Sequence, residues 1–485
     1  MSARSSVVIV GGGIAGLAAA WELSGGGDGP TPDAPRIEVI EASECVGGAL
    51  RATAFAERTL DLGPDGFLAR RPEAVTLARE LGLEEQLVPI AASGASIWLK
   101  GALEELPTGL VLGVPTNAKS IKEMKGLTWS ARWPAWRDEH SPKKLKVTDD
   151  VSIGTILRRK LGSELTYQLI EPMVGGIQAG RVDELSAEAV FPALFEAAQR
   201  GGSLMKALRA AAGPGASGGA AAERVLGPLF MSLRDGVGSL ATELARQLRD
   251  RGVVVRTDAA VTAIRPTPSG TYPWEVDTAD TATGASAIIL ATPAPVAGRL
   301  THVLDEALSG LSSINSASAA MITFVFDDKY ISLPATGTGI LIPLATAWDD
   351  DIMMTTAVTF LDRKWEHLRR EGEVVLRAHV GRIDDRRSDV MGDEMLIERV
   401  RAELATVLGR VGTPRASRLQ RWPQGLPQYY VGHNQLVARA RHALAPYAIR
   451  LAGSPYDGVG IPASIGSGRR AAREVRELLG AASHD

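Results

Sequence analysis

The sequence predicts an α/β protein that has a second, β-rich part and an inserted helical part. An apolar, β-branched run at Ser6–Val10 is followed by a glycine-rich turn, a helical stretch at Leu17–Leu23 and a second apolar run at Arg36–Ile40. Between about residues 115 and 225 the spacing of apolar residues is helical. Later in the chain short β-branched runs recur, which is typical of strands.

The composition is that of an ordinary globular protein. The chain has 485 residues, and 53 Lys and Arg against 56 Asp and Glu give a formal charge of −3. A nucleic-acid-binding protein would carry a basic excess, so no nucleic-acid partner is expected. The single cysteine, Cys45, excludes an internal disulfide and a cysteine-built zinc site. We recognise no signal peptide and no apolar run of about 20 residues, and we therefore expect a cytoplasmic protein without a membrane span.

Each expected element follows from local sequence. Ser6–Val10 and Arg36–Ile40 are continuous apolar runs, as buried parallel strands are. The Gly/Pro-rich stretch Ser24–Pro35 predicts a surface loop, and low-complexity Ala211–Ala222 predicts a mobile loop. The helices predicted later in the chain are Ile153–Leu161, Leu204–Ala212 and Ile465–Leu479. The later strands are predicted at Val253–Arg256, Val261–Ile264, Ala287–Leu290, Ala319–Phe326, Ile340–Pro343, Ala357–Phe360, Val374–Val380 and Ile449–Ala452.

The turn after the first strand carries a Gly-x-Gly-x-x-Gly motif made by Gly11, Gly13 and Gly16. The first glycine permits the tight turn, the second lets the backbone approach a pyrophosphate, and the third lets helix and strand pack closely. The helix N-terminus offers unpaired N–H groups to the phosphates. Glu41 ends the second strand, where a carboxylate can accept hydrogen bonds from ribose hydroxyls. These features predict a Rossmann-like dinucleotide site; the alternative is a tight βαβ turn without a ligand.

Further motifs extend this pattern. Glu41-Ala42 followed by Gly47-Gly48 resembles the signature of the FAD-dependent amine-oxidase superfamily. The sequence departs from it at Cys45, where arginine is usual, and we expect Cys45 to be a half-buried structural residue rather than a redox thiol. The resemblance implies non-covalent FAD, whose site is closed by the C-terminal stretches Leu451–Gly453 and Tyr456–Pro462; the alternative is that these stretches are only a glycine-rich connector. We find no second glycine motif after a strand, so a separate nicotinamide domain is not expected. The expected electron acceptor is oxygen or another diffusible oxidant.

Four further stretches narrow the resemblance to the oxygen-dependent porphyrinogen oxidase family. They are Leu62–Leu68, Glu171–Gly180 with Glu184–Ser186 and Phe191-Pro192, Arg421–His433, and Gly458–Pro462. The departures are Gln178 for the usual tyrosine and Arg181 where aspartate is frequent. Leu103–Thr116 is similar to a stretch of the Gram-positive, coproporphyrin-forming type.

The resemblance implies three domains: an FAD-binding domain of residues 1–75, 226–300 and 430–485, a substrate-binding domain of 76–112 and 301–429, and a helical domain of 113–225. It implies Arg71, Gly175 and Ile177 as substrate-binding residues, and neither a metal site nor a catalytic side chain is expected. The cofactor-binding residues that it implies are Gly11, Gly13, Ile14, Ala15, Gly16, Glu41, Ala42, Gly47, Gly48, Gly63, Pro64, Val261, Trp422, Gly453, Val459, Gly460 and Ile461.

The implied activity is the six-electron oxidation of coproporphyrinogen III to coproporphyrin III in haem biosynthesis, with hydrogen peroxide as by-product. Protoporphyrinogen IX is the alternative substrate. A flavin amine oxidase, a carotenoid desaturase and a non-catalytic porphyrin carrier are rival interpretations. The family context also implies product transfer to a ferrochelatase. His433 lies in a family motif and is expected to be structural rather than an acid–base group.

Charged and aromatic residues suggest two surfaces. Arg71 is the first candidate cation for substrate propionates, and Lys100, Arg181 and Lys329 are weaker ones. Trp129, Trp133 and Trp136 are spaced i, i+4, i+7 and so share one helix face. Lysines 122, 125, 143, 144 and 146 flank them. This helix either faces a membrane, as a peripheral contact, or packs within the helical domain.

Overall fold

The computed structural model describes residues 4–31, 34–141, 145, 147–212, 228–268 and 270–482. The chain forms two compact units. The first unit comprises Met1–Val88, Phe230–Asn315 and Asn434–Asp485, and the second comprises Pro89–Leu229 and Ser316–His433. The predicted α/β fold class is confirmed, whereas the three-domain division stays a prediction. Most of the predicted loop Ala211–Ala222 lies outside the described residues.

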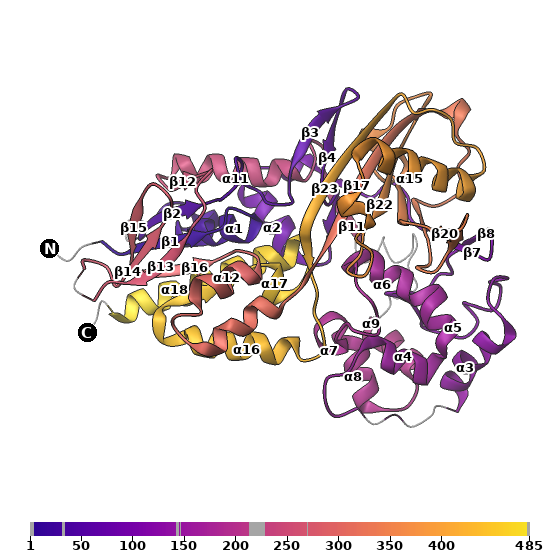
Figure 1. Cartoon of the computed structure of the whole chain (residues 1–485), viewed down its shortest axis with the longest axis horizontal. Helices are drawn as coiled ribbons and strands as arrows, with labels where there is room; N and C mark the ends of the chain where they lie inside the picture. The colour runs from indigo at the N-terminus through magenta and orange to yellow at the C-terminus, as the bar shows by residue number, and fades with distance from the viewer. Residues whose placement is uncertain are drawn as a thin grey trace. The chain divides into compact units, whose positions relative to one another are not determined.

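A five-stranded parallel sheet forms the centre of the first unit (Figure 1). Its strand order is β12 (Val254–Arg256), β2 (Arg36–Ile40), β1 (Ser6–Val10), β16 (Ala287–Leu290) and β24 (Ile449–Leu451). The strands β1, β2 and β16 have the bounds that their apolar runs predict. Both faces of the sheet are covered, which is why these strands are continuous apolar runs.

Alternate residues of β1 pack on opposite faces of this sheet. Val7 and Ile9 face a cluster formed with α1 (Ile14–Leu23), α2 (Pro72–Glu80), α11 (Gly238–Asp250) and α18 (Ile461–Ala482). Val8 and Val10 face a second cluster. That cluster includes residues of β13 (Ala263–Pro266), β14 (Trp274–Asp277), β15 (Ala282–Ala285), α12 (Ala294–Thr301) and α16 (His433–Leu444). The result is a three-layer arrangement.

Short elements complete the first unit. They are the hairpin β3 (Ala52–Phe55) and β4 (Arg58–Asp61), the small sheet of β5 (Phe67–Leu68), β11 (Phe230–Leu233) and β6 (Leu87–Pro89), and α17 (Ser454–Asp457). The predicted closing helix Ile465–Leu479 is the central part of α18.

The second unit contains a seven-stranded mixed sheet. Its order is β23 (Ala416–Pro427), β17 (Ser316–Asp327), β22 (Glu373–Val380), β21 (Thr355–Phe360), β18 (Gly339–Leu341), β7 (Ser96–Leu99) and β8 (Ala102–Glu105). Only the pair of β18 with β7 is parallel among the pairs described. Leu396, Val400 and Leu404 of α15 (Asp393–Leu408) pack into the core of this sheet. Shorter elements are β19 (Ala347–Trp348), β20 (Asp351–Ile352), α13 (Leu361–Lys364) and α14 (Arg387–Val390).

The helical part of the second unit has its own hydrophobic core. It comprises α3 (Trp129–His140), α4 (Ile153–Leu161), α5 (Ser163–Leu165), a π-helical turn at Thr166–Ile170, α6 (Glu171–Gln178), α7 (Ala187–Val190), α8 (Pro192–Arg200) and α9 (Leu204–Ala212). The bounds of α4 and α9 are those predicted. The hairpin β9 (Leu110–Val111) and β10 (Val114–Pro115) precedes these helices. No helix in the described ranges is both long and apolar enough to cross a membrane.

Candidate cofactor and substrate site

The glycine motif forms a tight turn whose glycines have distinct roles. Gly11 has a φ of +106°, and a Cβ there would lie 2.4 Å from the carbonyl oxygen of Ala291. A Cβ on Gly16 would lie 2.0 Å from the oxygen of Gly11, so α1 begins directly against the end of β1. A Cβ on Gly13, in contrast, would meet no described atom within 4 Å. The turn therefore leaves open space in front of the N-terminus of α1.

That helix N-terminus is free to bind an anion. Gly13 is the N-cap residue of α1, and among the described residues no side chain caps it and no acidic residue lies in the first turn. The first N–H groups of an uncapped helix lack partners and carry the positive end of the helix dipole. An uncapped terminus beside open space fits the pyrophosphate of a dinucleotide.

Glu41 is held firmly beside this turn. Its Oε2 accepts a hydrogen bond from the N–H of Gly12 at 2.6 Å, and its Oε1 accepts from the N–H and Oγ of Ser43 at 2.9 and 2.6 Å. A Cβ on Gly12 would lie 2.9 Å from the Cβ of Glu41, so glycine permits this approach. The carboxylate lies at the carboxyl end of β2, where the ribose hydroxyls of a dinucleotide bind in this fold.

The second glycine pair lies directly against the first turn. Gly47 forms a parallel bridge with Gly13 and donates its N–H to the oxygen of Gly12 at 2.8 Å. Gly47 and Gly48 have φ values of +105° and +60°. Cys45 is half-buried, as predicted.

Arg51 is a cofactor-site candidate that the motif search missed. Its Nη2 donates to Oγ of Ser43 at 3.2 Å, and its buried Nε has no hydrogen-bond partner in the described part of the chain. Ser43 also binds Glu41, so the guanidinium lies in the loop where the superfamily signature has its arginine. Arg51 thus offers a cation near Cys45, six residues later in sequence.

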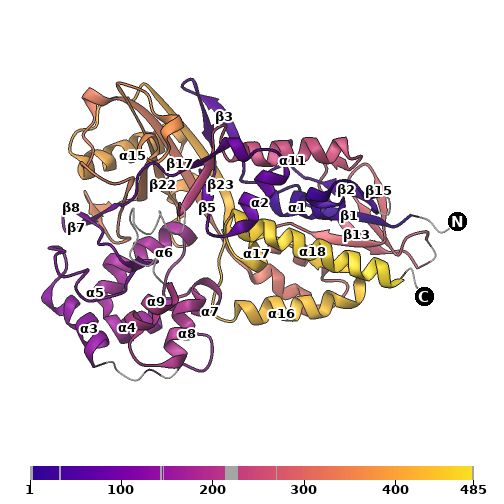
Figure 2. The ribbon, with the colours of Figure 1, turned by 180° about the vertical axis from the view of Figure 1, so that it is seen from behind.

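The C-terminal segment returns to the same region of the first unit. A Cβ on Gly453 would be 3.6 Å from Cβ of Ala15, and one on Gly468 would be 2.0 Å from the oxygen of Ala15. The residue that follows the end of β24 by two positions and helix α18 therefore pack closely on α1, and Figure 2 shows α18 running beside α1. Gly458 and Gly460 have φ values of +112° and +119°, and they form the turn from which α18 starts at Ile461.

Asp457, a partly buried acid, fixes this turn. Asp457 accepts hydrogen bonds from Arg441 at 2.6 Å, from Arg470 at 2.8 Å and from Ser467. Burial acts to raise the pKa of Asp457, but the hydrogen bonds from Ser467 and Arg441 and the charges of both arginines outweigh it and hold the pKa below its usual value. The hydroxyl of Tyr456 is buried, and burial raises its pKa.

Arg71 is the N-cap residue of α2, and its Nη2 pairs with Glu73 at 3.1 Å. It lines a cavity of about 460 Å³ within the first unit, between α2 and α18. The other charged residues of the lining are Glu73, Asp457, Arg469, Arg470 and Arg473. Gly63 and Val261 are buried in the first unit, Pro64 is partly buried and Ala42 is exposed.

Other predicted site residues belong to the second unit. Gly175 is buried in α6, whereas Ile177 is 47% exposed near its end. Trp422, predicted as cofactor-binding, lies half-exposed in β23. The roles of these residues remain predictions.

Two signature elements meet at the end of α6. Gln428 of the Pro-Gln-Tyr element donates to the oxygen of Gln178 at 2.7 Å. A Cβ on Gly180 would lie 2.2 Å from Oε1 of Gln428, so this glycine allows the approach. Tyr429 stacks on buried His433 with ring centroids 4.2 Å apart, which agrees with a structural role for this histidine.

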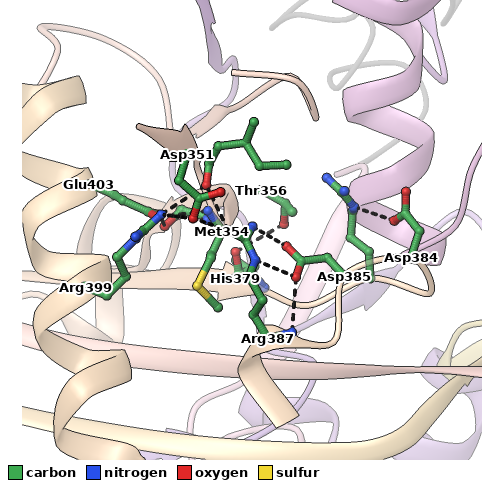
Figure 3. A network of polar contacts seen from close by, with 12 residues as sticks. Asp351, Met354, Thr356, His379, Asp384, Asp385, Arg387, Arg399 and Glu403 are labelled. Atoms are coloured by element: carbon green, nitrogen blue, oxygen red, sulfur yellow. Dashed lines mark hydrogen bonds and ion pairs between the residues drawn. The ribbon is translucent and has the colours of Figure 1, made fainter. Parts of the chain in front are cut away.

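Arg181 is already engaged in ion pairs. Its Nε lies 3.1 Å from Glu171 and its Nη1 lies 2.9 Å from Asp384, near the network drawn in Figure 3. Burial raises the pKa of Glu171 despite the charge of Arg181. Lys100 pairs with Glu164 at 3.4 Å, and Lys329 lies over the ring of Tyr330. The two ion pairs of Arg181 weaken the argument for it as a propionate-binding cation, whereas Lys100, with a single partner, and Lys329 stay weaker candidates.

The network in Figure 3 stabilises the scaffold around α15. Buried Glu403 accepts from the N–H groups of Met354 and Thr355 at 3.0 and 2.9 Å and from Arg399 at 2.8 Å. Asp351 bridges Arg399 and Arg387. These contacts tie the segment before β21 to α15.

The parallel sheet, the glycine turn and the acid at the end of β2 define a dinucleotide-binding protein. The chain belongs to the family of flavin-containing amine oxidoreductases, whose family model matches residues 14–476.

Relatives cover nearly the full chain. It is 32% identical over 479 residues to the coproporphyrinogen III oxidase of Bacillus subtilis, covering 98% of this chain and 99% of that protein. It is 29% identical over 494 residues to the protoporphyrinogen oxidase of Bos taurus, covering 97% and 98%. The crystal structure of an Exiguobacterium protein assigned as a protoporphyrinogen oxidase superposes with a TM-score of 0.85 at 30% identity, covering 99% of this chain and 100% of that one.

Proposed function

We propose that this protein oxidises coproporphyrinogen III to coproporphyrin III, with FAD as cofactor and oxygen as the final electron acceptor. The observation that carries the proposal is the end-to-end similarity to the Bacillus subtilis coproporphyrinogen III oxidase. The Staphylococcus aureus enzyme of the same name supports it, at 29% identity over 481 residues with 97% of this chain and 98% of that protein covered. The proposal includes a cytoplasmic location and product transfer to a ferrochelatase-type enzyme.

The stretch Leu103–Thr116, which resembles the coproporphyrin-forming type, supports the choice of substrate. It contains the hairpin β9–β10, and Gly113 lies in the hairpin turn. A Cβ on Gly113 would lie 3.0 Å from Cα of Ile170 and 3.2 Å from Cβ of Met173. The stretch therefore packs on the start of α6, the helix that carries the predicted substrate-binding residues Gly175 and Ile177. A substitution in this hairpin would therefore alter how α6 is packed.

The arginine-lined cavity at Arg71 is a second support. Coproporphyrinogen III carries four propionates and protoporphyrinogen IX carries two, so the first gains more from guanidinium groups. Arg71 is about half exposed and pairs with a single carboxylate, so a propionate can compete for it. We propose Arg71 as a propionate-binding residue rather than a purely structural N-cap.

The chemistry removes six electrons and six protons from the substrate in three two-electron steps, and three oxygen molecules become hydrogen peroxide. When bound, FAD supplies the two-electron acceptance and the transfer to oxygen. The N-terminus of α1 would bind the pyrophosphate, and Glu41 the ribose. We assign Arg51 to the same site as a phosphate-facing cation. The turn before α18 would present backbone N–H groups to the flavin.

The decisive experiment compares aerobic turnover of coproporphyrinogen III and protoporphyrinogen IX by the purified holoprotein, with porphyrin fluorescence as the signal. We expect a higher kcat/KM for coproporphyrinogen III. The bovine relative and the Exiguobacterium structure favour protoporphyrinogen IX as the second candidate, and preference for it would overturn our substrate choice. Absence of turnover with either, in protein that holds FAD, would favour an amine oxidase or a porphyrin carrier.

A further inference from the structure

A small cavity lies beside the edge strand β24 of the five-stranded sheet, within the first unit. Its volume is about 170 Å³, more than ten times the ~10–15 Å³ that one water molecule requires. Helices α16 and α18 complete its walls, and its charged lining residues are Arg441, Arg450, Arg470 and Glu474. None of the predicted cofactor-binding residues is among the described residues that line it. The cavity is therefore separate from the predicted dinucleotide site.

The arginines around this cavity outnumber the carboxylates that pair with them. Glu474 accepts a hydrogen bond from Arg470 at 2.5 Å and lies 3.1 Å from Nε of Arg450. Asp457 accepts from Arg441 at 2.6 Å and from Arg470 at 2.8 Å. In the described part of the chain, three guanidinium groups therefore share two carboxylates, and the excess positive charge favours an anion in the cavity.

Two of these arginines also have a structural role at the edge of the sheet. Among the described strands, β24 has no partner on its outer side, so its outward carbonyl groups need other donors. Arg450 donates to the oxygen of Ile449 and Arg470 to the oxygen of Leu451, both at 2.9 Å. This role uses only part of the N–H donors that each guanidinium carries.

Two buried N–H groups of the lining arginines have no partner. The Nε atoms of Arg441 and Arg470 are buried, and neither has a hydrogen-bond partner within the described ranges. A buried donor without a partner is unfavourable, and native proteins usually satisfy such a group with water or an ion. Because both arginines line the cavity, an occupant of the cavity can supply the missing acceptors.

We propose that this cavity binds an oxyanion of the phosphate type, either inorganic phosphate or the phosphate group of a small metabolite. Guanidinium groups match the oxygens of phosphate because their N–H donors form a planar fork. A dianion also gains more than a singly charged carboxylate from three arginines. The rest of the lining is apolar, which keeps bulk water from competing for these donors; it consists of Leu444, Ala445, Ile449 and Leu451.

Arg441 and Arg470 connect the cavity to the turn before α18. Both hold Asp457, which accepts a hydrogen bond from Ser467, and the Oγ of Ser467 accepts from the N–H of Gly453 at 2.8 Å. An anion that draws the two guanidinium groups towards itself weakens their hold on Asp457. Since that turn would present N–H groups to the flavin, phosphate should weaken FAD binding, and FAD should weaken phosphate binding by the same factor.

Isothermal titration calorimetry of the purified holoprotein with inorganic phosphate tests the site, at an ionic strength held constant with sodium chloride. We expect saturable binding. Arg450→Gln should weaken it by at least about fivefold, whereas Glu474→Gln removes the acid that competes for the arginines and should tighten it by about threefold or more. Loss of folding cannot explain tighter binding. A matched control is Arg246→Gln, the same charge change at an exposed, ion-paired arginine of α11, which should bind phosphate as the parent does.

Two further ligands define the anion. Acetate should bind at least about tenfold more weakly than phosphate at the same ionic strength. Glycerol 3-phosphate that binds as tightly as phosphate would assign the site to a phosphorylated metabolite, and its failure to bind would assign the site to inorganic phosphate. The coupling is measured by FAD titration of the apoprotein with and without saturating phosphate, and we expect about fivefold weaker FAD binding with phosphate.

Four results would overturn the proposal. They are the absence of saturable phosphate binding, equal affinity for acetate, unchanged phosphate affinity in Arg450→Gln, and loss of binding in Arg71→Ala alone. The last would assign the anion to the larger cavity at Arg71, which Arg470 also lines. Equal FAD affinity with and without phosphate would refute the coupling to the turn. Phosphate binding needs no porphyrinogen, so these results are independent of the test of the proposed activity.

Discussion

Two glycines of the same turn should respond to substitution in opposite ways. Gly13 has φ −68° and ψ 174°, an extended conformation that valine adopts readily, and its Cβ would enter open space. Gly13→Val should therefore fold and yet block the approach of the pyrophosphate. Gly16→Ala places its Cβ 2.0 Å from the oxygen of Gly11, so it should disturb the fold itself.

The magnitudes follow from these contacts. Gly13→Val removes charge-assisted hydrogen bonds worth about 1.5–3 kcal/mol, which corresponds to roughly ten- to a hundredfold weaker FAD binding. Its effect on apoprotein stability should stay below about 1 kcal/mol, the difference between N-cap residues. Gly16→Ala must push α1 from β1 and should cost about 1–3 kcal/mol, the usual range for overpacking.

The assay is a fluorescence titration of each apoprotein with FAD, together with thermal unfolding of the apoprotein. We expect Gly13→Val to lose affinity at nearly unchanged Tm. Gly16→Ala should lower Tm by about 1 °C for each kcal/mol lost, because an unfolding entropy of ~2.1 cal/mol/K per residue sums to ~1 kcal/mol/K over the 485 residues. Parental FAD affinity in Gly13→Val would refute the assignment of the turn as the pyrophosphate site. An unchanged Tm in Gly16→Ala would refute the packing argument.

Three further predictions concern single side chains. Arg71→Ala should raise KM for coproporphyrinogen III more than it lowers kcat, because it removes binding shared by ground and transition states; unchanged steady-state kinetics would leave Arg71 as a helix cap only. Arg51→Met should weaken FAD binding by about tenfold, because Arg51 supplies the positive charge that the family signature has at the position of Cys45. Arg51→Lys keeps the charge and should restore part of the affinity; equal affinity of the two variants for FAD would contradict this role. Lys160→Met removes the cation that lies 3.5 Å from buried Asp138, so chemical denaturation should show a loss of about 3–5 kcal/mol; a loss below about 1 kcal/mol would show that the hydrogen bonds from Ser203 and Met205 satisfy Asp138.

The elements whose bounds are predicted most accurately from the sequence are those buried on all sides. The strands at Ser6–Val10 and Ala287–Leu290 have the predicted bounds because both of their faces are covered, which makes their apolar runs continuous. Strand β23 was not predicted, because two prolines at 423 and 427 argue against a central strand. It lies at the edge of its sheet, where proline is tolerated.

Side-chain pairings in the site needed the three-dimensional structure. Arg51 reaches Ser43 only because the backbone turns at Gly47 and Gly48, and no motif spacing records that turn. Arg181 was a reasonable candidate cation from its position in the sequence. In the structure it forms ion pairs with Glu171 and with Asp384, which is distant in sequence. The spacing of the tryptophans predicted a shared face without indicating whether it lay inside or outside. Ala131 and Ala135 on the opposite face of α3 are buried and Trp129 is 71% exposed, so the shared face of the tryptophans lies outside.

The close packing of α18 on α1 has a consequence for the order in which the protein is made. The turn at Gly11–Gly16 leaves the ribosome among the first residues, but Gly468, which packs on Ala15, is synthesised more than 450 residues later. At a translation rate of ~5–20 residues per second, α18 is synthesised tens of seconds after the glycine turn. Until then the apolar face of α1 has no α18 to cover it, so early binding by a chaperone or by FAD itself would protect the growing chain from aggregation.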